Sequence, residues 1–154
     1  MRTLGLDVGT KTIGVAVSDG LGLTAQTVTT IRRTSLKADL AALTELVREY
    51  EAERFVVGLP LNMNGTEGPR AEATRKFVDT LTQALGLPVE LWDERMSTMA
   101  ATRTLLEADL SRARRREVID QMAAQFILQG WLDAKSIAAA RAPHDEDEDE
   151  DEEP

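Results

Sequence analysis

Residues 3–17 read TLGLDVGTKTIGVAV and predict a β-hairpin at the start of the chain. In the first half of this stretch, leucine and valine alternate with glycine and aspartate, which is the pattern of a strand with one apolar face. Residues 13–17 form a second, largely β-branched run, and the polar GTKT between the two runs is typical of a turn. An Asp-Gly turn then leads to a third alternating run at residues 23–31. Three antiparallel strands are therefore expected to open the domain.

Helices and strands are predicted to alternate after these three strands. Apolar residues at spacings of three and four follow Ser35, a residue type that favours helix N-caps, and predict an amphipathic helix. Short apolar runs at residues 54–59 and 88–92 predict buried strands with a second helix between them. Two more helices are expected afterwards, the first capped by Ser97 or Thr98. The order β-β-β-α-β-α-β-α-α is typical of an α/β fold with a five-stranded mixed sheet and helices on both faces, and the ribonuclease H-like fold is the best-known case.

The net charge of the chain comes from one short segment. The 154 residues include 18 Lys and Arg against 27 Asp and Glu, a formal charge of −9, but residues 145–153 are nine consecutive acids. Without them the acids and bases balance, so the neutral body does not exclude a nucleic-acid partner. A run of like charges repels itself and buries no apolar surface. We expect one domain at residues 1–142 and a disordered acidic tail at residues 143–154, which either aids solubility or competes with substrate as a nucleic-acid mimic.

Composition narrows the chemistry. The chain has no cysteine and a single histidine, His144, which excludes disulfides, cysteine metal sites and a histidine-based catalytic triad. Carboxylates, hydroxyls, Lys, Arg or a metal held by oxygen atoms remain. No apolar stretch reaches the roughly 18 residues that a membrane span needs, and the N-terminus is unlike a signal peptide. A soluble, cytoplasmic protein with no membrane partner is expected.

Three acids are candidates for an active site. Asp7 ends the first strand on the face opposite its apolar residues, where a charge is costly unless it is paired or binds a metal. Asp93 and Glu94 follow a strand predicted to be parallel to the first, so this pair and Asp7 should reach the same edge of the sheet. Adjacent acids point to opposite sides, so one of the two is expected to serve the site. Asp120 lies in the first turns of the last helix, at the boundary of its buried face. Three converging carboxylates favour Mg²⁺ or Mn²⁺ and metal-dependent phosphodiester hydrolysis.

Each acid also has a purely structural interpretation. Asp7 is able to cap the hairpin or pair with Lys11, and Glu94 is able to pair with Arg95 in a solvated turn. An acid such as Asp120 near a helix N-terminus is stabilised by the helix dipole. Taken singly, none of the three is specific.

Basic and amide side chains are predicted near these acids. Lys11 follows Asp7 in the hairpin, and the segment SRARRRE at residues 111–117 leads into the last helix. A loop reading LNMNGTEGP contributes amide and hydroxyl groups before a helix N-terminus, which is able to receive a phosphate. The alternatives are an ordinary solvated charge run and a turn-rich connection. The predicted substrate-binding residues are Lys11, Asn62, Arg95, Arg115 and Arg116.

Four segments resemble the successive motifs of one family. They are LGLDVGTKTIGVAVSD, VVGLPLNMNGTEGPRA, LWDERMST and RREVIDQMAAQFIL. Together they are similar to the YqgF/RuvX family of RuvC-like pre-16S rRNA nucleases and Holliday-junction resolvases. The resemblance covers residues 3–132 and leaves out the acidic tail.

The resemblance implies a ribonuclease H-like fold, a divalent metal, and a role in maturing the 5′ end of the small-subunit ribosomal RNA precursor. Asp7, Glu94 and Asp120 match the family's acids, which makes them the implied catalytic and metal-binding residues. Thr12 stands where the family usually has arginine. RuvC-type resolvases carry a second acid three residues after the helix acid, where this chain has Ala123, and Glu117 one turn earlier is a substitute to consider.

Several functions and partners stay open at this stage. The leading expectation is a nuclease acting on RNA, with branched or single-stranded DNA as a second substrate and precursor ribosomal particles as partners. A Holliday-junction resolvase-like nuclease of recombination and repair, a non-catalytic preribosomal RNA-binding factor and a nucleotide-binding ATPase are the alternatives. ATPases that share the Asp-x-Gly-Thr pattern enclose their nucleotide between two lobes, and this chain has the length for one. A monomer or a homodimer is expected.

Overall fold

The computed structural model describes residues 2–96 and 112–151, with side chains described for residues 2–95 and 119–141. Its centre is a five-stranded mixed sheet in the order β3-β2-β1-β4-β5. The strands are β1 (Arg2–Val8), β2 (Thr12–Ser18), β3 (Ala25–Arg32), β4 (Ala52–Leu59) and β5 (Val89–Asp93). The first three pair antiparallel, and β1, β4 and β5 run parallel. The predicted fold class is confirmed.

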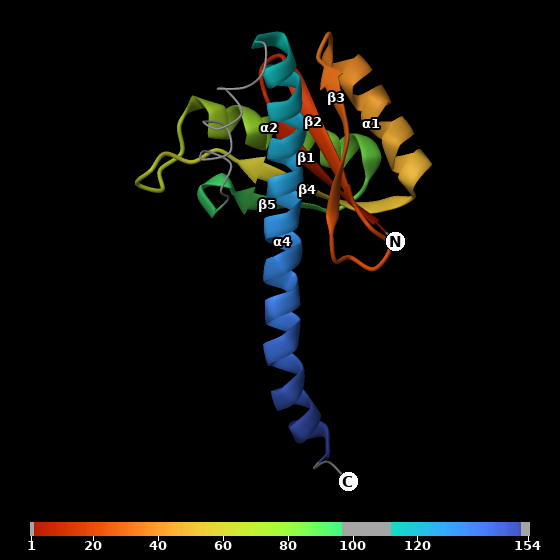
Figure 1. The fold of residues 1–154 in the computed structure, drawn as a ribbon, viewed down its shortest axis with the longest axis vertical. Helices are drawn as coiled ribbons and strands as arrows, with labels where there is room; N and C mark the ends of the chain where they lie inside the picture. The colour runs from red at the N-terminus through yellow and green to blue at the C-terminus, as the bar shows by residue number, and fades with distance from the viewer. Residues whose placement is uncertain (1, 97–111, 152–154) are drawn as a thin grey trace.

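Two helices cover one face of the sheet (Figure 1). α1 (Leu36–Tyr50) begins where the Ser35 hydroxyl accepts a hydrogen bond from the Ala38 N–H, as expected of an N-cap. α2 (Pro69–Leu85) ends at Gly86, whose φ of 72° is in the left-handed region that favours glycine. Between these helices and the sheet lies a core that includes Leu4, Leu6 and Phe55, all fully buried.

α4 (Arg112–Asp151) covers the opposite face, which we call the α4 face. Ala124, Ile127, Leu128 and Trp131 are buried there against β2, β1 and β4. The helix packs closely because β1 has a glycine beneath it: a Cβ on Gly5 would lie 2.7 Å from Leu128 Cβ. Helices therefore lie on both faces, as the element order predicts.

Beyond Leu132, α4 leaves the domain, and residues 133–141 are all exposed (Figure 1). The helix continues to Asp151, so it includes most of the segment in which we expect disorder. Acids four residues apart repel one another on a helix, which favours disorder in this stretch. The disordered tail stays a prediction, to be tested in solution.

The helical course of α4 bears on the nucleic-acid-mimic interpretation of the tail. At 1.5 Å per residue, the first tail acid lies about 37 Å along the helix from Asp120. Figure 1 places the end of α4 far from its start, on the other side of the sheet domain. A helical tail therefore does not reach the candidate site of its own chain.

Other expectations fall partly or wholly outside the described residues. The helix predicted after Ser97 or Thr98 lies in the undescribed segment at residues 97–111. A short 3-10 helix, η1 (Glu94–Met96), precedes that segment. Within the described part of the chain, no helix is both long and apolar enough to cross a bilayer.

Candidate active site

The candidate site lies where the parallel strands β1, β4 and β5 end, which we call the carboxyl edge. Asp7 is the next-to-last residue of β1 and is half-buried. Its neighbours Leu6 and Val8 belong to the core under α1 and α2, so Asp7 is on the α4 face, as predicted. In the sheet register it pairs with Gly14 of β2.

Gly14 brings Asp120 to this place. A Cβ on Gly14 would lie 2.0 Å from the main-chain oxygen of Asp120, so only glycine lets α4 approach β2 this closely. The Thr12 hydroxyl donates a hydrogen bond of 2.8 Å to Asp120 Oδ2. Asp120 is half-buried. Because its main chain lies over Gly14, it sits over the strand position that is paired with Asp7.

A second glycine makes room for Glu94 on the other side of β1. A Cβ on Gly58 would lie 2.9 Å from Glu94 Cγ and 3.0 Å from its Oε2, so the Glu94 side chain lies over β4. Because Leu6 pairs with Val57, Gly58 is the β4 residue next to Asp7. Strand positions without side chains thus flank Asp7, one beneath each of the other two predicted acids.

These acids suit a hard cation by their chemistry, since Mg²⁺ and Mn²⁺ prefer carboxylate oxygens. Among the described residues, no three Asp, Glu, His or Cys side chains are grouped closely enough to enclose a metal ion by themselves. Mg²⁺ is commonly held by one or two carboxylates, with water and substrate phosphates completing its coordination. The donor set therefore fits a metal shared with a substrate, and Asp7 together with Asp120 or Glu94 would hold it.

Arg95 pairs with Asp93, the last residue of β5. Arg95 Nη2 and Nε donate to the Asp93 carboxylate at 2.7 and 3.1 Å, and Nη1 donates to Met63 O. Hydrogen bonds from the Arg95 side chain hold the pKa of Asp93 below its ordinary value. Arg95 thus joins the end of β5 to the loop before α2, and its predicted role in substrate binding stays a prediction.

The other predicted substrate-binding residues lie in different surroundings. Asn62 ties its own loop together, because its Nδ2 donates to Thr66 Oγ1 at 2.9 Å. Lys11 is exposed in the turn between β1 and β2. Arg115 and Arg116 belong to the first two turns of α4, and their side chains lie outside the described residues, as does that of Glu117.

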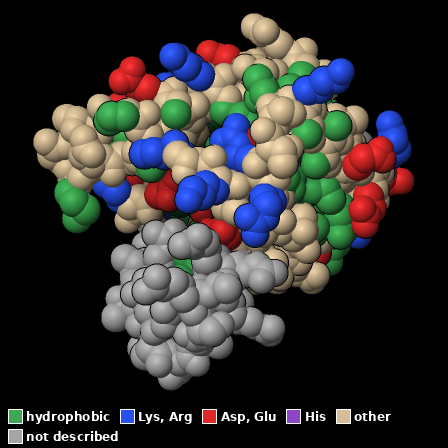
Figure 2. All heavy atoms as spheres, turned by 90° about the horizontal axis from the view of Figure 1, so that it is seen from above, with side chains coloured by type: hydrophobic (Ala, Val, Ile, Leu, Met, Phe, Trp, Pro, Cys, Tyr) green, Lys and Arg blue, Asp and Glu red, His purple; other side chains and the backbone are tan. Residues whose placement is uncertain are grey.

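Sequence reasoning missed two arginines at this edge. Arg33 Nη1 donates to Gly9 O and Arg70 Nη2 donates to Val8 O, each at 2.8 Å. Viewed from above, Lys and Arg side chains gather across the middle of the molecule, with Asp and Glu side chains beside them (Figure 2). Arg70 follows the Gly-Pro that begins α2, but no pattern in the sequence indicates that either arginine reaches the end of β1.

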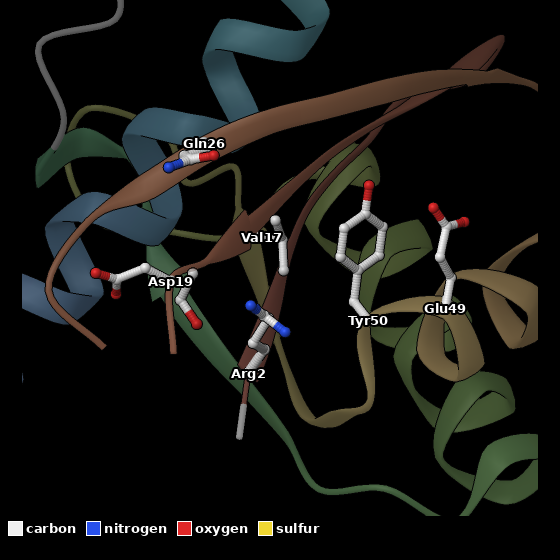
Figure 3. Close-up of a pocket in the computed structure, with 7 residues that line it drawn as sticks. Arg2, Val17, Asp19, Gln26, Glu49 and Tyr50 are labelled. Carbon is white, nitrogen blue, oxygen red and sulfur yellow. The ribbon is translucent and has the colours of Figure 1, made fainter. Parts of the chain in front are cut away.

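The structure also has a hollow of about 360 Å³ away from Asp7, Glu94 and Asp120. Figure 3 shows it at the amino end of β1, where Arg2, Asp19 and Tyr50 line it from separate elements. Backbone hydrogen bonds, chiefly from the Leu23 N–H, lower the pKa of Asp19 and engage this carboxylate in its own turn. This hollow takes no part in the candidate active site.

A mixed sheet with three leading antiparallel strands, helices on both faces and acids at the carboxyl edge defines a ribonuclease H-like domain. Comparison with known proteins gives the family. The model of the family described as "RuvX: Holliday junction resolvase" matches residues 1–134, and the chain belongs to that family.

Two proteins with closely similar sequences have the same description. A protein of Myxococcus xanthus called "Putative pre-16S rRNA nuclease" is 79% identical over 134 residues, which are 87% of this chain and 89% of that protein. A protein of Symbiobacterium thermophilum with the same description is 66% identical over 143 residues, or 93% of this chain and 97% of that protein.

Solved structures share the fold at low sequence identity. RuvC of T. thermophilus, solved in complex with a Holliday junction substrate, matches with a TM-score of 0.56 at 14% identity. The match covers 88% of this chain and 96% of that one. The Fowlpox virus resolvase bound to Holliday junction DNA matches with a TM-score of 0.50 at 8% identity, over 87% of this chain and 98% of that one. These likenesses confirm the ribonuclease H-like architecture.

Proposed function

We propose that this protein is a divalent-metal-dependent nuclease that hydrolyses phosphodiester bonds during 5′-end maturation of pre-16S rRNA. The observation that carries the proposal is the placement of Asp7 between Gly14 and Gly58, the two residues that make room for Asp120 and Glu94. The descriptions of relatives as similar as 79% identical support ribosomal RNA as the substrate. The proposed setting is the cytoplasm, with precursor ribosomal particles as partners and the protein acting as a monomer or homodimer.

Each residue has a role in the proposed reaction. Asp7, Glu94 and Asp120 are the proposed ligands of Mg²⁺ or Mn²⁺, which supplies an activated water and stabilises the leaving oxygen when bound. Thr12 holds the Asp120 carboxylate through its hydroxyl. Lys11 and the arginines of the carboxyl edge attract the phosphate backbone, since positive charge beside a catalytic centre raises the local concentration of a polyanion.

A second candidate is a Holliday-junction resolvase-like DNA nuclease. The description of the matching family and the architecture shared with RuvC favour it. The residue three positions after Asp120 counts against it, because Ala123 is buried there and offers no carboxylate. A non-catalytic preribosomal RNA-binding factor is the third candidate, and it predicts binding without turnover.

A cleavage panel separates these candidates. The full chain is incubated with a pre-16S rRNA fragment, a single-stranded RNA and a four-way DNA junction, each with Mg²⁺, with Mn²⁺ and with a chelator. The proposal predicts metal-dependent cleavage of the precursor rRNA at its 5′ side. Cleavage of the junction alone would favour the resolvase, and RNA binding without cleavage under every condition would favour the non-catalytic factor.

A further inference from the structure

A second hollow opens at the carboxyl edge, behind Asp7 on the side of α1 and α2. Its volume is about 360 Å³. The residues that matter to its chemistry come from three places: Thr10 from the β1–β2 turn, Arg33, Ser35 and Asp39 from the start of α1 and the segment before it, and Arg70 from the first turn of α2.

Arg33 is held in place by its surroundings. Its Nε donates to Asp39 Oδ2 at 2.9 Å, its Nη1 donates to Gly9 O, and its guanidinium lies 5.1 Å from the centre of the Phe77 ring. A guanidinium carries five N–H donors, so these two hydrogen bonds leave donors for a ligand. A fixed guanidinium loses little conformational entropy when it binds.

Arg70 is more open than Arg33. It is exposed, and within the described residues its one hydrogen bond is the 2.8 Å bond from Nη2 to Val8 O. That bond sets the side chain across the end of β1, one residue beyond Asp7. The remaining donors of Arg70 form the fork that binds a phosphate through two oxygens.

Asp39 is the acid among these residues, and its effect is local. It is 2% exposed, and its Oδ2 accepts from Arg33, while its Oδ1 is buried with no hydrogen-bond partner among the described residues. Asp39 therefore balances the charge of Arg33, and the charge of Arg70 is left over. The start of α1 adds the partial positive charge of a helix N-terminus to the same hollow.

We propose that this hollow binds a phosphate group of the nucleic-acid backbone next to the phosphate that is cleaved. This inference rests on the proposed function, which makes nucleic acid the ligand. The hollow and the candidate site lie on opposite sides of the same strand end, so the phosphate bound in the hollow would be a neighbour of the one that is cleaved. Arg70 and Arg33 hold the main-chain oxygens of Val8 and Gly9, the two residues that follow Asp7. A nucleic-acid strand crossing the β1–β2 turn would place consecutive phosphates in the hollow and over Asp7.

Inorganic phosphate is the probe for the site itself. The full chain, with no divalent metal, is titrated with phosphate while the backbone amides of Thr10 and Leu36 are followed by NMR. Saturable shifts of these amides are expected, and Arg70→Gln is expected to weaken the binding at least several-fold. Arg75→Gln is the matched control, because Arg75 is on the same helix but pairs with Glu67 at 2.7 Å. Absent shifts, or equal binding by Arg70→Gln and the parent, would overturn the inference.

A second variant guards against a loss of folding. Arg70→Lys keeps the charge and one donor for Val8 O but has no planar fork, so it is expected to fold and to bind phosphate more weakly than the parent. Thermal unfolding of each variant is recorded beside the titration. If Arg70→Gln does not fold, the test passes to Arg70→Lys. Phosphate binding by Arg70→Lys as strong as that of the parent would then overturn the inference.

The salt dependence of RNA binding tests the nucleic-acid part separately from cleavage. Binding of single-stranded RNA in a chelator is measured over a range of salt concentrations. Loss of one phosphate contact in Arg70→Gln should make the negative slope of log K against log salt shallower by about 0.7, the value for one contact to a single strand, with no change in Arg75→Gln. An unchanged slope beside normal, Asp7-dependent cleavage would overturn the subsite and leave the proposed function intact. Phosphate binding without any RNA binding would overturn nucleic acid as the ligand of this hollow, and the cleavage panel would test the proposed function separately.

Discussion

The Thr12 hydroxyl donates a 2.8 Å hydrogen bond to Asp120 Oδ2, linking β2 to the early turns of α4 across 108 residues of sequence. The bond is partly buried, and Thr12 is two residues before Gly14, over which the Asp120 main chain passes. These contacts fix where the Asp120 carboxylate lies relative to Asp7. A residue that departs from the family's usual arginine therefore positions one of the three proposed metal ligands in this chain.

Thr12→Val tests this positioning role. Valine keeps the shape and the strand preference of threonine but donates no hydrogen bond, so the free energy of unfolding should fall by about 1 kcal/mol. Calorimetric titration with Mn²⁺ should show weaker binding than in the parent. Thr12→Ser keeps the hydroxyl and should restore Mn²⁺ binding. Equal Mn²⁺ affinity in Thr12→Val and the parent would contradict the role.

Gly14→Ala tests the close approach of α4 to β2. The added Cβ would meet the main-chain oxygen of Asp120 at 2.0 Å, and backbone cannot move aside as a flexible side chain does. We expect a loss of roughly 2 kcal/mol or more in the free energy of unfolding, measured with urea. Gly20→Ala is the control, because its Cβ would have no atom within 4 Å. Similar stability of the two variants would show that α4 does not pack here as described.

The Asp93–Arg95 pair predicts a pH dependence of stability. The pKa of Asp93 is lowered in the folded protein by hydrogen bonds from Arg95, so the pair stabilises the fold above the ordinary aspartate pKa of about 3.9. This contribution is lost as the pH falls through the lowered value. In urea unfolding between pH 3 and 6, the free energy of unfolding should fall less steeply with decreasing pH in Asp93→Asn than in the parent. Arg95→Gln should have the same effect, and a profile identical to the parent's in both variants would rule the linkage out.

The acidic tail is predicted to be disordered at neutral pH although α4 is continuous to Asp151. If repulsion between the acids melts this segment, removing residues 143–154 leaves the helical circular dichroism signal per molecule unchanged at pH 7. Protonation near pH 3 removes the repulsion, so the full chain should then gain helix relative to the shortened one. A clear loss of helical signal at pH 7 on truncation would show that the tail is helical.

The sequence was enough to predict the features that depend on nearby residues. Ser35 caps α1 and Gly86 ends α2, because caps are set by local chemistry. The face of Asp7 followed from the alternation of its neighbours in β1. Element order and family motifs together indicated the fold.

Features that depend on residues far apart in the chain could not be predicted. Gly14 and Gly58 lie beneath Asp120 and Glu94 only because of the strand register and the path of α4. Arg70 bonds a main-chain oxygen 62 residues away, and such a bond leaves no residue pattern to recognise. The pairing of Arg95 with Asp93 joins two nearby residues, and it was not predicted because it depends on the turn into η1.

The most direct test of a carboxylate metal site is the cleavage rate of Asp7→Asn in saturating Mg²⁺ or Mn²⁺, on the substrate that the parent cuts best. Asparagine keeps the size of the side chain and removes the charge that would bind the cation. The account predicts a fall of about 100-fold or more, with thermal unfolding close to the parent's. Asp79→Asn, an exposed position on α2, should cut at the parent's rate. A folded Asp7→Asn protein that cuts as fast as the parent would contradict the assignment of this site.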